Sequence, residues 1–196
     1  MYDQRPNFIL GFHGCDEETC KNLLVNPNDI KISDKPFDWL GHGMYFWENN
    51  YDRALLWAKE KNNKGNIKKP SVIGAILQLG YCCDFTDSKF ISLVKEHHRL
   101  LVNNYKAIEK ELPINKDIKF DKYKDKILRE LDCTTIEFMH SQIYTNIKKK
   151  LLLKVLPNLK YLIAHEAFLP KVVKLFRVRV FLRKVTFKFA SEIIIL

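Results

Sequence analysis

The amino-acid sequence predicts an α+β protein, because short apolar strands are interspersed with longer helical segments. Three runs rich in β-branched and aromatic residues are expected to form strands, at residues 8–12, 44–47 and 71–79. Helical patterns cover residues 16–25, 51–61, 87–107 and 127–140. With 196 residues, the chain is long enough to bury a sizeable core.

The first strand is expected over Phe8 to Phe12, with His13 and Gly14 at its end. A glycine at the end of a strand lets the backbone approach another molecule without a Cβ in the way. The helix that follows begins with acidic residues, which suit the positive end of the helix dipole. It is expected to end by Asn26, before a loop over residues 27–41 that could form part of a binding site.

The second strand follows Gly41-His42-Gly43, and the next helix runs from Tyr51 to Lys61. Glu48 is predicted to cap this helix, since carboxylates favour helix N-termini. The apolar residues of the helix are Ala54, Leu55, Trp57 and Ala58. A tryptophan on a helix is most often a core residue.

The later elements are predicted from apolar periodicity. Residues 71–79 are nearly apolar throughout, which indicates a strand in the centre of its sheet. In the helix over 87–107 the residues expected to point inward are Phe90, Ile91, Val94, Leu100 and Leu101. The charged stretch over 115–126 is interpreted as a solvated connection before the last predicted helix.

Two motifs carry a resemblance to a known family. They are Gly11-Phe12-His13-Gly14 and, about thirty residues later, Asp38-Trp39-Leu40-Gly41-His42-Gly43-Met44-Tyr45-Phe46-Trp47-Glu48. Together with the helix behind them they resemble the nicotinamide-binding half of diphtheria-toxin-like and PARP-like ADP-ribosyltransferases, and more narrowly small bacterial PARP-like proteins. The strong match covers residues 7–60. It implies split antiparallel β-sheets with flanking helices around an NAD cleft.

The resemblance also implies roles for individual residues. NAD would be the co-substrate, with His13 on the ribose of the adenosine side and the backbone of Gly14 on the nicotinamide amide. Tyr45 would pack its ring on nicotinamide, and Trp57 could offer a second stacking face. Charge complementarity at an oxocarbenium-like sugar would supply much of the rate. The structural alternatives are a hydrogen-bonded core histidine for His13 and a packed core residue for Tyr45.

The sequence departs from the family pattern at two places. The family serine that contacts the nicotinamide amide corresponds to Arg53, which cannot accept a hydrogen bond. The family glutamate, often in a Val-Phe-x-Glu-Gly context, is absent. Glu192 and Glu166 are the late carboxylates that remain, and Glu192 is the candidate catalytic partner of Tyr45.

The chain divides by composition into residues 1–147, the PARP-like domain, and a basic C-terminal segment over 148–196. Residues 148–190 contain twelve lysines and arginines and one acid, Glu166. The segment is interpreted as the domain's last strands, as a solvated basic strand, or as a nucleic-acid contact. It could also be a frame-shifted tail, because the codons for residues 180–185, when read one nucleotide earlier, permit the sequence Val-Phe-x-Glu-Gly.

The leading functional hypothesis is an NAD-dependent ADP-ribosyltransferase that releases nicotinamide and transfers ADP-ribose to an unknown protein or nucleic-acid acceptor. One alternative is a relative that only binds or hydrolyses NAD, or is inactive. Another is a basic nucleic-acid-binding protein that acts through its C-terminal segment.

Cellular location and redox state are predicted from composition. No apolar run approaches the roughly 20 residues that span a bilayer, and the N-terminus does not resemble a signal peptide, so a cytoplasmic protein is expected. The chain has 5 cysteines, an odd number without paired spacing, which is typical of reduced thiols. No set of residues has the spacing of a structural metal site, and no metal is expected.

Overall fold

The computed structural model describes residues 3–4, 8–119, 124–155, 178–181 and 187–195. The chain forms two compact units. The first combines residues 2–33, 43–90 and 176–196, and the second combines residue 1 with 34–42 and 91–175. Each unit is described separately below.

The described elements confirm the α+β class. The strands are β1 (Asp3–Gln4), β2 (Phe8–Asp16), β3 (Met44–Glu48), β4 (Pro70–Cys83), β5 (Val178–Phe181) and β6 (Phe187–Ile195). The helices are α1 (Glu17–Val25), α2 (Tyr51–Asn63), α3 (Ser88–Ala107) and α4 (Glu130–Val155). The four helices and three N-terminal strands expected from the sequence are therefore present, with shifted ends.

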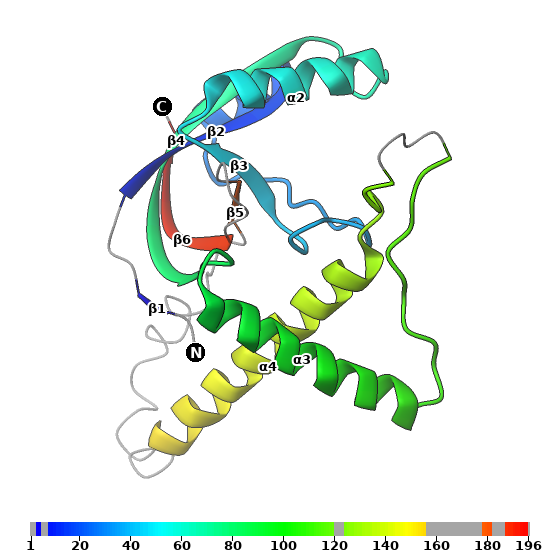
Figure 1. Ribbon diagram of the computed structural model, residues 1–196. Helices are drawn as coiled ribbons and strands as arrows, with labels where there is room; N and C mark the ends of the chain where they lie inside the picture. Colours follow the sequence, from blue (N-terminus) through cyan, green and yellow to red (C-terminus); the bar gives the residue numbers. More distant parts are fainter. Residues whose placement is uncertain (1–2, 5–7, 120–123, 156–177, 182–186, 196) are drawn as a thin grey trace. The chain divides into compact units, whose positions relative to one another are not determined.

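The strands form one sheet of six, in the order β1-β4-β2-β3-β5, with β6 on the other edge of β4 (Figure 1). All pairings are antiparallel except that of β3 with β5. The expected division into two small sheets is not seen among the described strands. At 14 residues, β4 is long enough to pair with β2 along its first half and with β1 and β6 further on.

The two faces of this sheet are covered by different helices. On one face Phe46 and Leu77 are almost fully buried, and α1 contributes Cys20 and Leu23 to the same cluster. On the other face α2 lies against β2, with Ala54 and Ala58 completely buried (Figure 1). Small residues on α2 allow the close approach of helix and strand.

Strand β2 continues to Asp16, four residues beyond its predicted end, because β4 provides a pairing partner as far as Pro70. His13 therefore lies inside a strand rather than at its end. Asp16 itself is the N-cap of α1, since its side chain accepts a hydrogen bond from the Glu18 amide at 3.1 Å.

The predicted capping role of Glu48 is wrong. Glu48 is the last residue of β3, and the N-cap of α2 is Asn50, whose side chain accepts a hydrogen bond from the Arg53 amide at 3.0 Å. Asn49 adopts a positive φ of 50° between strand and helix. An Asn-Asn pair suits this junction, because asparagine tolerates the left-handed conformation and caps helices well.

Helix α3 matches its predicted range, but only part of its predicted buried face is confirmed. Phe90 and Leu101 are buried, whereas Ile91 and Leu100 are 41% and 43% exposed. His97 is buried in line with Phe90 and Leu101, and its ring nitrogen Nδ1 lies 2.8 Å from the Leu93 carbonyl. The apolar stripe is therefore narrower than the sequence indicates.

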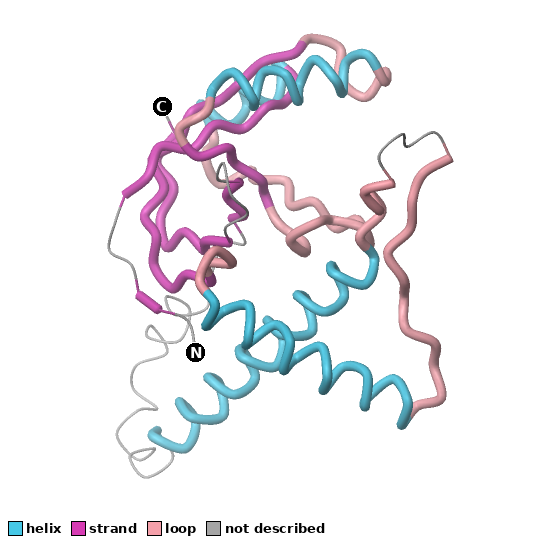
Figure 2. Tube along the Cα trace, in the orientation of Figure 1, coloured by secondary structure: helices cyan, strands magenta, loops and turns pink. Residues whose placement is uncertain are grey.

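The described parts of the connection from α3 to α4, residues 108–119 and 124–129, form neither helix nor strand (Figure 2). The two ends of the connection are joined by a bridge between Lys116 and Leu128, with hydrogen bonds of 2.9 and 3.1 Å. The side chain of Asn115 then accepts hydrogen bonds from the amides of Leu131 and Asp132, at the start of α4.

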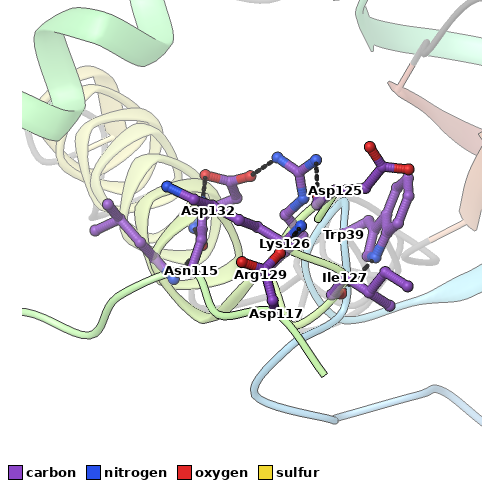
Figure 3. A network of polar contacts seen from close by, with 9 residues as sticks. Trp39, Asn115, Asp117, Asp125, Lys126, Ile127, Arg129 and Asp132 are labelled. Carbon is purple, nitrogen blue, oxygen red and sulfur yellow. Dashed lines mark hydrogen bonds and ion pairs between the residues drawn. The ribbon is translucent and has the colours of Figure 1, made fainter. Parts of the chain in front are cut away.

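Arg129 ties this connection to the segment that contains Trp39, within the second unit (Figure 3). The guanidinium lies 5.2 Å above the Trp39 ring and 3.2 Å from the Asp132 carboxylate. The Trp39 indole donates a hydrogen bond to the Ile127 carbonyl at 2.9 Å. Trp39 of the second motif therefore has a structural role in this unit.

Candidate functional site

The candidate site lies where β2 and β3 separate, within the first unit. The two strands are paired only at Gly11 with Glu48 and at Phe12 with Trp47. Just before these pairs, the Asn49 amide donates to the Leu10 carbonyl at 2.8 Å. If β2 and β3 stayed paired in the same register beyond Phe12 and Trp47, Gly14 would be opposite Tyr45. The two strands are no longer paired at these residues.

Beyond the last backbone pair, the side chain of His13 bonds to the backbone of β3. The carbonyl of Tyr45, which would accept from a backbone amide in a continued ladder, lies 2.7 Å from Nδ1 of His13. Because a carbonyl oxygen can only accept, Nδ1 must carry the proton and donate. The hydrogen bond fixes the tautomer of a neutral imidazole, so Nε2 is left as an acceptor.

The peptide groups of Gly14 face the same separation. Backbone groups of alternate strand residues point to the same side, and the Leu10 carbonyl points towards β3. The pairing of β2 with β4 has no register shift from Phe8 to Asp16. The amide and carbonyl of Gly14, four residues after Leu10, therefore also point to the β3 side, beyond the last paired residue of β3.

The His13 ring is in a largely apolar environment. It lies partly buried, with its centroid 5.7 Å from that of the Phe46 ring. Burial lowers the pKa of His13, and the hydrogen bond to the Tyr45 carbonyl opposes this effect only in part. The neutral form of the imidazole is therefore favoured at pH 7.

Tyr45 approaches the separation from the other face of the sheet. Successive side chains of a strand point to opposite faces, so Tyr45 lies opposite to Met44 and Phe46. The His13 ring lies on the Phe46 side. The imidazole and the phenol therefore lie on opposite faces of the sheet, and the contact between the two residues is the one from the His13 ring to the Tyr45 backbone.

Gly14 has a packing role that the sequence did not reveal. A Cβ at this position would lie 2.1 Å from the Ala54 carbonyl oxygen and 3.3 Å from the Ala58 Cβ. The glycine is therefore required for the contact between β2 and α2. The space that its missing side chain leaves is filled by α2, and Gly14 itself is buried.

Arg53 and Trp57 lie on α2 and are engaged with other residues. The Arg53 guanidinium lies 4.8 Å above the Trp47 ring and 3.1 Å from the Glu60 carboxylate. Trp57 is 39% exposed, so it is not the core residue that a helical tryptophan usually is. Lys61 lies 4.8 Å above the Trp57 ring. A stacking role for Trp57 on nicotinamide stays a prediction.

The late carboxylates are not brought to His13 by the described sheet. Glu192 is paired with Gln78 of β4, whereas His13 is paired with Ile73, five residues along the same strand. At about 3.3 Å per residue, this corresponds to roughly 16 Å along the sheet. Glu166 lies outside the described residues.

The basic C-terminal segment supplies β5 and β6 to the sheet. In β5, Arg179 is in register with Tyr45. This register could not be read from the sequence, because parallel partners are joined by long connections without a local signal.

Two other sequence features have local structural roles. His42 lies in the second unit, where its amide donates to Glu137 at 2.8 Å. The Cys15 and Cys20 sulfur atoms are 3.2 Å apart and buried, and burial raises the pKa of Cys15.

Within the described part of the chain, no group of three His, Cys, Asp or Glu residues is placed to hold a metal ion. No described helix is both long and apolar enough to cross a membrane.

A comparison with known proteins finds a distant relative. The chain is 30% identical over 99 residues to an uncharacterised protein of Methanocaldococcus jannaschii. The match spans 50% of this chain and 43% of the relative, less than half of that protein. No known family profile matches the chain. No solved structure matches it.

Proposed function

We propose that the protein binds NAD where β2 and β3 separate and transfers its ADP-ribose moiety, with release of nicotinamide. The observation that carries the proposal is the hydrogen bond from His13 Nδ1 to the Tyr45 carbonyl at 2.7 Å. It replaces the strand pairing at the two positions that the resemblance assigns to NAD. An ADP-ribosyltransferase-like fold around this point belongs to the same proposal.

The residues at this point have the chemistry that a dinucleotide needs. Nε2 of a neutral His13 can accept a hydrogen bond from a ribose hydroxyl. The peptide amide and carbonyl of Gly14 can pair with the oxygen and nitrogen of a carboxamide. The Tyr45 ring offers an aromatic face to the planar nicotinamide. NAD itself supplies the labile glycosidic bond, and these side chains and peptide groups would bind and orient it.

Direct measurement of NAD binding by calorimetry tests the site. His13→Gln and Tyr45→Leu are expected to weaken NAD binding at least tenfold while the protein stays folded, because each removes one directed contact. His98→Gln is the matched control, since His98 has no role in the proposal. NAD affinities equal to that of the wild type in both site variants would contradict the assignment.

The backbone contact of Gly14 is tested by changing the ligand. Nicotinic acid adenine dinucleotide carries a carboxylate in place of the carboxamide, so it cannot donate to the Gly14 carbonyl and would bring a negative charge towards it. Its affinity is expected to be at least tenfold below that of NAD. Equal affinities would show that nicotinamide is not held by these peptide groups.

A second candidate function is NAD binding or hydrolysis without transfer. It is favoured by the position of Glu192, whose partner on β4, Gln78, is five residues from Ile73, the partner of His13. It is also favoured by Arg53, which stands at the position of the family serine. Release of nicotinamide together with labelling of an acceptor from radiolabelled NAD supports transfer. Release without labelling supports hydrolysis, and binding without release supports an inactive relative.

A further inference from the structure

We propose that the C-terminal end of α2 and the turn after it bind single-stranded nucleic acid, through the exposed Trp57 ring and the lysines around it. This α2-end surface consists of Trp57, Lys61, Lys64 and Lys68. It lies in the first unit.

The first support is an excess of uncompensated positive charge. Residues 57–69 include five lysines and one acid, Glu60. That acid is bound by Arg53 at 3.1 Å, and Lys69 is bound by Glu17 at 2.7 Å. Within the described part of the chain, Lys61, Lys64 and Lys68 have no carboxylate within ion-pair distance, and Lys61 lies over the Trp57 ring instead. Three cations of this surface therefore remain for a polyanion.

The second support is the local fold, which gathers these residues. Trp57, Lys61 and Lys64 are spaced by four and three residues, so they lie along one side of the helix. After the helix the chain turns back at Gly65, whose φ of 73° suits glycine and whose missing side chain leaves open space.

Hydrogen bonds hold the turn in place. The Asn62 side chain donates to the carbonyls of Ile67 and Lys68 at 2.7 and 3.0 Å. The Lys68 amide donates to Asp16 at 2.7 Å. These bonds anchor the backbone of Lys68 to the body of the unit. The α2-end surface is therefore built on an ordered turn.

The third support is the exposed indole. Trp57 is 39% exposed, and Lys61 covers one face of its ring at 4.8 Å. A large aromatic ring beside unpaired lysines fits a ligand that has both planar bases and phosphates. In a duplex the base faces are already stacked, so this combination favours a single strand. Lysines near a helix C-terminus also interact favourably with the dipole, but this does not explain an exposed tryptophan among them.

The test measures binding of a fluorescent 12-nucleotide oligothymidylate to the full chain as a function of salt. The variant Lys61→Gln/Lys64→Gln/Lys68→Gln removes three charges from the α2-end surface. The matched control, Lys95→Gln/Lys106→Gln/Lys110→Gln, removes three charges from exposed lysines of α3 and its end. The slope of log affinity against log salt is expected to fall by about 2 in the first variant and to change little in the control. Equal losses in both variants would mean a general effect of net charge and would overturn the proposal.

The contribution of the indole is tested separately. Trp57→Ala is expected to weaken oligothymidylate binding on the order of tenfold, whereas Trp57→Phe retains most of the binding. A duplex of the same length should bind more weakly than the single strand. Unchanged oligothymidylate affinity in Trp57→Ala, or equal binding of duplex and single strand, would refute the stacking role.

Discussion

Replacement of Gly14 by alanine is expected to destabilise the protein strongly, because the new methyl group has no space. It would lie 2.1 Å from the Ala54 carbonyl oxygen. Carbon and carbonyl oxygen are normally separated by about 3.3 Å. Relief therefore requires α2 to move away from β2 by about 1 Å, which loosens the packing of the buried Ala54 and Ala58.

The expected cost is at the upper end of the range for overpacked cores, about 3 kcal/mol. For a chain of this size it corresponds to a decrease in Tm of about 6–12 °C. The free energy of unfolding can be measured by urea denaturation followed by circular dichroism. A Gly14→Ala variant as stable as the wild type would refute the close contact between helix and strand.

Gly74 offers a matched control, since it is a glycine of the neighbouring strand β4. A Cβ at Gly74 would meet Phe12 Cε1 at 3.5 Å, an ordinary van der Waals contact. Gly74→Ala is expected to be neutral or to raise stability by up to about 1 kcal/mol, because alanine restricts the unfolded chain. A loss as large as that of Gly14→Ala would mean that any β-carbon in this sheet is harmful, and the packing argument would fail.

Two further predictions concern buried polar groups. Burial lowers the pKa of His13 below 6.5, so the unfolded state binds more protons below that pH and stability decreases as the pH falls through about 6.5. His13→Gln should show a smaller decrease in denaturation midpoint between pH 7 and 5, and an unchanged pH dependence would contradict the burial of a neutral imidazole. The hydroxyl of Thr135 is buried without a hydrogen-bond partner among the described residues, so Thr135→Val is expected to raise the free energy of unfolding by up to about 1 kcal/mol. Thr134→Val, which removes a 2.8 Å bond to the Glu130 carbonyl, should not raise it, and the reverse order would refute the assignment.

The sequence alone determined the local elements of the protein. Apolar periodicity and β-branched runs identified β3, β4, α2 and α3 close to their observed ranges, because these signals depend only on neighbouring residues. The acidic first turn of α1 was also predicted, although Asp16 is the N-cap and not the first helical residue. Local chemistry was less reliable at element ends, where Asn50 rather than Glu48 caps α2.

Only the tertiary structure decided how these elements meet. The extension of β2 through His13, the end of its pairing with β3, and the hydrogen bond from His13 to Tyr45 all depend on partners that are distant in sequence. The close approach of α2 to Gly14 and the register of Glu192 on β4 are likewise non-local. The residue types of the candidate site could be read from the sequence because they form local motifs. Their geometry could not, because strand register and helix packing are set by long-range contacts that have no local sequence signal.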